Sequence, residues 1–135
     1  MINERDLDVL NILWESEEPM LVVDIVARKK GLTQSTVTAV LRKLLKEELV
    51  EVTGVTHSGR ALGRVYRPTE RSREVLLADF LELYNRFSSV ISEAEICAKI
   101  LCGSKNEDKI KAEYRRLMEL TEMSEIFEGF TERNK

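Results

Sequence analysis

The sequence predicts a mainly α-helical fold with one small β-hairpin, divided into an N-terminal domain over residues 1–68 and a C-terminal domain over residues 69–135. Over most of the chain, apolar residues recur every three or four positions, which is the spacing of amphipathic helices. Two short runs of alternating apolar and polar residues, 49–53 and 61–68, indicate the strands of a hairpin. After Pro68 the apolar residues spread over more than one helical stripe, which indicates a second domain.

The composition is that of an ordinary globular protein and excludes several classes. Hydrophobic residues make up 43% and charged residues 33% of the 135 positions, with only 6 glycines and 2 prolines, so disorder and collagen-like structure are excluded. The longest apolar runs have four residues, whereas a membrane helix needs about 20. Six acidic residues among the first twenty do not fit a signal peptide. We therefore expect a cytoplasmic protein with no membrane association.

The charge is distributed unevenly along the chain. Residues 1–27 carry one base and seven acids, a net charge of −6, while residues 28–67 carry nine bases and three acids, a net charge of +6. Residues 69–135 return to a net charge of −3. A basic block between two acidic ones is expected when one face of a domain binds phosphate groups.

Residue types needed for catalysis or metal binding are sparse. His57 is the only histidine and has no nearby cysteine or carboxylate, and the six glycines form no phosphate-binding motif. Cys97 and Cys102 lie about 140° apart around the axis of an expected helix, so they do not converge on one metal ion. We expect no enzyme activity, no metal, no cofactor and a structural role for both cysteines.

Three helices are predicted in the first half of the chain. The first begins after Asn3, a typical N-cap residue, and extends to about Trp14. The second begins near Val22 and ends in the basic triplet 28–30 before Gly31, because basic residues followed by glycine are stop signals. Thr33 caps the third. The apolar stripe of this third helix consists of Val37, Val40, Leu41, Leu44 and Leu45.

The opposite side of the third helix carries small residues, hydroxyls and bases. At about 100° per residue, the side chains that project away from the core or flank that side are Ser35, Thr38, Ala39, Arg42, Lys43 and Lys46. A helix in the major groove of DNA needs small residues for close approach and hydrogen-bond donors for base edges. The second helix, the turn at Gly31 and the third helix therefore match the helix-turn-helix plan.

The hairpin is expected to form a wing beside this helix. Residues 56–60, which include His57 and Arg60, are expected to form the loop between the strands, and the return strand adds Arg64 and Arg67. Glycine, hydroxyls and bases at a hairpin tip are typical of a wing on the sugar-phosphate backbone. The sequence thus predicts an N-terminal winged helix-turn-helix domain.

The second domain is expected to be helical and to dimerise. Thr69 can cap a long helix over residues 70–87, and Ser92 and Asn106 can cap two more. The apolar surface of the long helix is too wide for one small neighbour to bury, so a second copy of the chain is the expected partner. The residues expected at this interface are Leu76, Phe80, Leu83, Tyr84, Phe87, Ile100 and Leu117. The last stretch of the chain, with Ile126, Phe127 and Phe130 among acids, is expected to be either a docking turn or a frayed tail.

The helix-turn-helix segment has a characteristic sequence. Residues 32–44 read LTQSTVTAVLRKL, preceded by a leucine-rich helix that ends in Trp14 and followed by the tripeptide at residues 66–68. With these features the chain resembles, over roughly residues 4–120, the penicillinase-repressor (BlaI/MecI/CopY) family of bacterial transcription regulators. The C-terminal half agrees in its pattern of apolar helices. The resemblance implies a homodimeric repressor that binds an inverted-repeat operator in double-stranded DNA.

The resemblance also implies how such a repressor is released. In the β-lactam branch of the family, a membrane sensor protease cleaves the dimerisation domain, and in the copper branch metal exchange occurs at a Cys-x-Cys pattern. This chain has no Cys-x-Cys, so a copper response is not expected. A sensor protease is an expected partner, with no cleavage site assigned.

Nine residues are expected to contact DNA. Ser35, Thr38 and Arg42 are expected to read base edges, and Arg42 is the best guanine contact because its fork matches O6 and N7. Thr36 either donates to a phosphate or satisfies the first helical turn. The full expected set is Gln34, Ser35, Thr36, Thr38, Arg42, Lys43, Lys46, Arg60 and Arg64.

Two features depart from the family pattern. The family commonly ends the third helix with Lys-Gly, and here Glu47 and Glu48 stand instead. This loses the glycine that adopts positive φ freely and places negative charge at the negative end of a helix, which is expected to cost on the order of 1 kcal/mol. The wing is also several residues longer, so the family's operator preference is not carried over.

Two other interpretations fit the same features. A PadR- or MarR-like regulator also joins a winged helix to dimerising helices, and it would be gated by a small ligand in a pocket. A winged-helix protein-interaction module would instead use the basic stripe to bind an acidic partner. DNA binding that ignores sequence would favour the interaction module over a specific repressor.

Overall fold

The computed structural model describes residues 2–103 and 105–121. These residues form six helices and a two-stranded hairpin, in two compact units, Met1–Asn85 and Arg86–Lys135. The predicted mainly helical fold with a small hairpin is confirmed. The two units are described separately.

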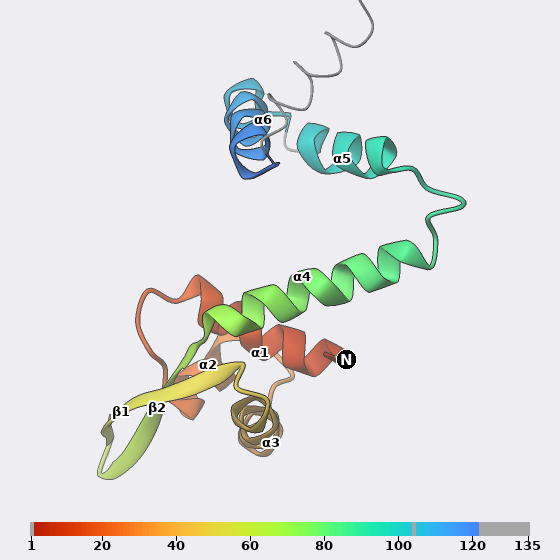
Figure 1. Cartoon of the computed structure of the whole chain (residues 1–135). Helices are drawn as coiled ribbons and strands as arrows, with labels where there is room; N and C mark the ends of the chain where they lie inside the picture. The colour runs from red at the N-terminus through yellow and green to blue at the C-terminus, as the bar shows by residue number, and fades with distance from the viewer. Residues whose placement is uncertain (1, 104, 122–135) are drawn as a thin grey trace, which may run out of the picture. The chain divides into compact units, whose positions relative to one another are not determined.

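The N-terminal unit contains three helices, the two strands of the hairpin and then a long helix, all of which the sequence pattern predicts (Figure 1). Their bounds are α1 Glu4–Glu15, α2 Val22–Arg28, α3 Gln34–Lys46, β1 Val50–Ser58, β2 Ala61–Pro68 and α4 Glu70–Asn85. The first helix begins with a capping box, in which the Asn3 side chain accepts from the Asp6 backbone N–H and the Asp6 carboxylate accepts from the Asn3 N–H. Thr33 likewise caps α3 through its side chain. The predicted starts of α1 and α3 are therefore both confirmed.

The core of this unit lies between α1, α2, α3 and the base of the hairpin. The side chains at its centre come from the predicted apolar stripes, and its fully buried members include Leu10, Leu13, Ile25, Leu41 and Leu44. Each such side chain contributes about 1.5–3 kcal/mol when it is removed from water. This burial leaves one side of α3 in solvent and fixes its orientation on the unit.

The hairpin is longer and more regular than the sequence pattern indicated. Strands β1 and β2 pair antiparallel from Val50 opposite Pro68 to Ser58 opposite Ala61, so only two residues form the turn. The expectation that residues 56–60 form a loop is therefore wrong, and His57 lies within β1 opposite Leu62. Gly54 does not end the first strand because an irregularity in the pairing between Val52 and Gly54 absorbs the extra residue.

Helix α4 belongs to the N-terminal unit. This compact unit therefore extends past Pro68, where the composition changes. The indole Nε1 of Trp14 donates to Ser72 Oγ at 2.9 Å, and the Ile2 backbone N–H donates to the Asp79 carboxylate at 3.1 Å. Ser72 is fully buried. These long-range bonds hold α4 against α1. The helix ends at Asn85 rather than at the expected residue 87.

The C-terminal unit contains α5 Glu93–Cys102 and α6 Glu107–Thr121. Ser92 forms a capping box with Glu95, and the Asn106 side chain accepts from the Lys109 N–H at 3.1 Å, so both predicted caps are confirmed. No residue of these two helices is buried. Both cysteines are exposed. The last stretch of the chain, with Ile126, Phe127 and Phe130, lies outside the described residues.

Within the described ranges, no helix combines the length and the hydropathy that crossing a membrane requires. Nor do the described residues bring together three or more side chains that could hold a metal ion.

Candidate nucleic-acid interface

The turn between α2 and α3 positions the start of α3. Gly31 adopts φ +94°, a conformation that glycine takes without a steric penalty, and Leu32 is buried immediately after it. Thr33 then accepts from the Thr36 N–H at 3.2 Å and donates to the Thr36 hydroxyl at 2.8 Å. Together these bonds and the buried leucine fix where the exposed side of α3 begins.

Four of the predicted DNA-contacting residues share one surface of α3. Gln34, Ser35, Thr38 and Arg42 are exposed and, with Ala39, line a shallow hollow along the outer side of the helix. None of the five lining residues is acidic. Small side chains at Ser35 and Ala39 leave space for a close approach, and Arg42 supplies a rigid set of donors at one end. Lys46 is exposed one turn further on.

Lys43, another predicted contact, is half-buried and pairs with a buried acid. Its Nζ lies 2.6 Å from Oδ2 of Asp6, a carboxylate on α1 that is only 1% exposed. The hydrogen bond to Asp6 raises the pKa of Lys43, against an opposing effect of desolvation. Lys43 therefore neutralises a buried acid and fastens α3 to α1, on a different side of the helix from the hollow.

Thr36 is also turned towards the protein. It is half-buried, and both its N–H and its hydroxyl are hydrogen-bonded to Thr33. Of the two roles that the sequence left open for Thr36, this geometry favours the satisfaction of the first helical turn.

The wing presents two of the predicted cations. Arg60 lies in the two-residue turn next to Gly59, which adopts φ +64°, and Arg64 lies on β2 opposite Val55. Both arginines are exposed. Arg67 is different, because it forms an ion pair with Glu51 across the hairpin. In the view of Figure 1, α3 and the hairpin tip both lie on the side of the unit away from α4.

Asp6 is a site residue that sequence reasoning missed. Its position three residues after Asn3 indicated only an acidic first turn, since a capping box and an N-terminal acid are both surface features in most helices. Nothing local connects it with Lys43, 37 positions away. The one available signal is that Lys43 lies on the flank of the apolar stripe, where a lysine stem is half-buried.

A helix-turn-helix with an exposed recognition helix and a basic hairpin wing defines a winged-helix DNA-binding protein. The model of the penicillinase repressor family matches residues 2–119 of this sequence. The chain therefore belongs to the penicillinase repressor family, whose members are winged-helix transcriptional regulators and not enzymes. No curated protein sequence matches the chain.

Solved structures of other regulator families are similar to this chain at low sequence identity. The MarR family regulator NMB1585 from Neisseria meningitidis is 20% identical, with 98% of this chain and 81% of that chain covered and a TM-score of 0.44. A PadR family regulator from Clostridium difficile R20291 is 17% identical, covering 68% and 94%, with a TM-score of 0.44. Bacillus subtilis PadR in complex with operator DNA is 19% identical, covering 84% and 77%, with a TM-score of 0.46.

Proposed function

We propose that this chain represses transcription as a homodimer that binds an inverted-repeat operator in double-stranded DNA. The observation that carries the proposal is the exposed side of α3, where Gln34, Ser35, Thr38, Ala39 and Arg42 line a hollow without any acidic side chain. A major-groove helix requires this combination of small residues and donors. Family membership supports the same conclusion.

The residues divide into two roles. Gln34, Ser35, Thr38 and Arg42 contact base edges, and Arg42 donates to a guanine through its two parallel N–H groups. Lys46 on α3 and the wing residues Arg60 and Arg64 neutralise phosphates and set the position of the domain on the duplex. Lys43 and Thr36 act indirectly, since their polar groups are bonded to Asp6 and Thr33 and hold α3 in place.

Exposed apolar side chains support the homodimer. Helix α4 exposes Leu77, Phe80, Leu81 and Leu83, and the C-terminal unit exposes further large apolar residues, among them Ile100 and Leu117. Large apolar side chains exposed in this number are a liability for a monomer. A twofold dimer places two recognition helices about one helical turn of DNA apart, which matches an operator with inverted repeats. A sensor protease is the partner that the family resemblance suggests for derepression, with no cleavage site assigned.

Fluorescence anisotropy tests the proposal directly. Labelled duplexes that tile the DNA upstream of the gene are titrated with the full chain, against a scrambled duplex, from low to physiological salt. We expect one fragment to bind about 10³-fold more tightly than the scrambled duplex, with log K falling steeply against log salt. Equally weak binding to every fragment and to scrambled DNA would argue against an operator there and in favour of an interaction module.

A further inference from the structure

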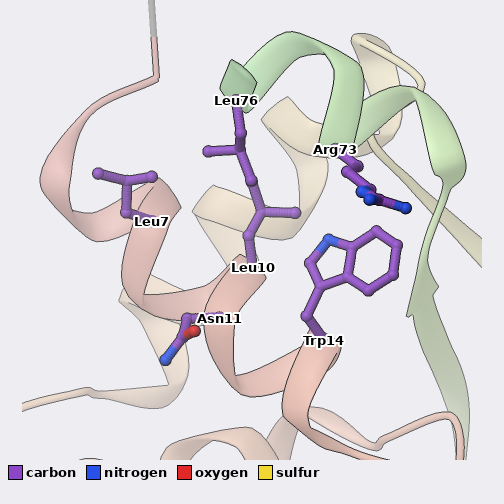
Figure 2. Close-up of a pocket in the computed structure, with 6 residues that line it drawn as sticks. All are labelled: Leu7, Leu10, Asn11, Trp14, Arg73 and Leu76. Carbon is purple, nitrogen blue, oxygen red and sulfur yellow. The ribbon is translucent and has the colours of Figure 1, made fainter. Parts of the chain in front are cut away.

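A groove within the N-terminal unit lies between α1 and α4, away from the hollow on α3. It has a volume of about 650 Å³, within the range of small-molecule sites. Its lining residues are Leu7, Leu10, Asn11 and Trp14 from α1, with Arg73 and Leu76 from α4 (Figure 2). The groove is therefore mostly apolar, with one amide and one cation.

The indole of Trp14 forms a fixed apolar wall of this groove. Its Nε1 donates to the buried Ser72 hydroxyl at 2.9 Å, so the ring is held in place, yet 40% of the residue is exposed. Figure 2 shows the guanidinium of Arg73 beside the ring, with Leu10 and Leu76 to the left of the ring across the groove that all four residues line. A held aromatic face of this kind suits a flat apolar ligand.

The cation in the groove indicates that the ligand also carries a negatively charged group. Arg73 approaches Glu70 only to 3.5 Å, and both side chains are about 70% exposed (73% and 69%), so this surface pair is weak. Asn11 donates to Glu15 at 3.3 Å. None of the six lining residues is acidic. An arginine fork over an apolar floor is complementary to a carboxylate attached to an apolar body.

From this complementarity we propose that the groove between α1 and α4 binds a small organic anion with an aromatic body and a carboxylate group. The aromatic body packs between Trp14 and the leucines, and the carboxylate accepts from Arg73. Binding itself does not depend on the DNA-binding proposal.

The walls of the groove are connected to the recognition helix. Helix α1 holds α3 through Asp6 and Lys43, and the start of α4 holds the end of α3, where Arg71 Nε donates to the Glu47 carbonyl at 3.2 Å and the Thr69 hydroxyl donates to the Glu48 carbonyl at 2.7 Å. A ligand that binds one spacing of α1 and α4 better than another therefore shifts the orientation of α3. This regulatory consequence rests on the proposed function.

The experiment uses the full ¹⁵N-labelled chain and 2-naphthoate as the probe. Trp14 is the single tryptophan, so its indole N–H gives one unambiguous resonance next to the groove. The uncharged 2-naphthamide is the ligand control. Arg73→Gln removes the cation, and Arg116→Gln is the matched control, because Arg116 is also exposed and paired at 3.5 Å with an acid three residues away.

We expect 2-naphthoate to shift the Trp14 resonance saturably, and Arg73→Gln to weaken this binding by about tenfold while Arg116→Gln leaves it unchanged. The amide should bind the parent chain and Arg73→Gln alike. The absence of a saturable shift, or an equal loss in both arginine variants, would overturn the proposed site. A fall in sedimenting mass as the probe binds would also overturn it, by assigning the groove to a second copy of the chain.

A second arm measures DNA anisotropy with the best-bound duplex. The probe should change the DNA affinity of the parent chain and leave that of Arg73→Gln unchanged, and equal behaviour of the two would overturn the regulatory consequence. The nuclear magnetic resonance arm contains no DNA, so failure of the groove and failure of the DNA-binding proposal are distinguishable.

Discussion

At the scale of single residues, the end of α3 contains backbone strain, because a residue other than glycine adopts positive φ there. Glu47 caps the helix with φ −87° and ψ 2°, and Glu48 then adopts φ +61°, the left-handed conformation in which helices usually place glycine. A residue with a Cβ pays about 1–2 kcal/mol there. The missing glycine predicts this cost, and the φ of Glu48 locates it.

Replacing Glu48 by glycine should stabilise the protein. We expect Glu48→Gly to raise the free energy of unfolding by about 1 kcal/mol. The backbone strain relieved at positive φ outweighs the larger conformational entropy that glycine gives the unfolded chain. Glu48→Gln is the control, since it removes the charge near the helix end but keeps the Cβ. Urea denaturation measures all three proteins, and a glycine variant no more stable than the glutamine variant would contradict the assignment of strain.

A second residue-scale prediction concerns Lys43 and pH. The raised pKa of Lys43 means that its contribution is fully present below the ordinary lysine pKa of 10.5 and is lost as pH rises through the higher pKa of the folded state. Lys43→Met, which keeps the apolar stem, should therefore be less stable than the parent at neutral pH, since it leaves the Asp6 carboxylate buried without its cation.

The gap in unfolding free energy between the parent and Lys43→Met should stay constant from pH 7 to about pH 9 and shrink above 10.5. Denaturant titrations at a series of pH values measure it. A gap that persists unchanged at the most alkaline pH would show that the lysine stabilises through its stem rather than through its charge.

At the scale of elements, the sequence predicted most helices closely because their signals are local. The caps Asn3, Thr33 and Ser92 all act as expected. The apolar stripe of α3 is buried except for Leu45, which is half-buried. The hairpin was underestimated because Gly54 resembles a strand end, although a pairing irregularity beside it continues the strand. Contacts such as that of Asp6 with Lys43 could not be predicted, since they depend on how α1 packs against α3.

The wing supplies an element-scale prediction. Arg64→Ala should weaken binding to operator and scrambled duplexes by the same factor and reduce the slope of log K against log salt by about 1, because one phosphate contact is lost. Arg67→Ala is the matched control on the same strand, since Arg67 is already paired with Glu51. Both variants are measured by anisotropy across a salt series. Equal losses of DNA affinity in the two would show that Arg64 does not contact a phosphate.

At the scale of the whole molecule, the proposed homodimer is supported by the exposed apolar side chains of α4. Phe80→Glu places a charge on the exposed side of α4, where the parent side chain is 49% exposed, and it should convert the dimer to a monomer in sedimentation equilibrium. Leu62→Glu is the control, because Leu62 is also exposed but lies on the wing. A parent chain that sediments as a monomer would contradict the prediction outright.

If the outer side of α3 reads DNA sequence, Arg42→Ala and Lys46→Ala must affect DNA binding differently. Both residues are exposed cations of α3, but only Arg42 lines the hollow. The measured quantity is the ratio of affinities for the operator and for a scrambled duplex at physiological salt. We predict that Arg42→Ala lowers this ratio by about tenfold or more, whereas Lys46→Ala weakens both affinities equally and leaves the ratio unchanged. An unchanged ratio in Arg42→Ala would show that Arg42 contacts a phosphate and that the outer side of α3 does not read base sequence through it.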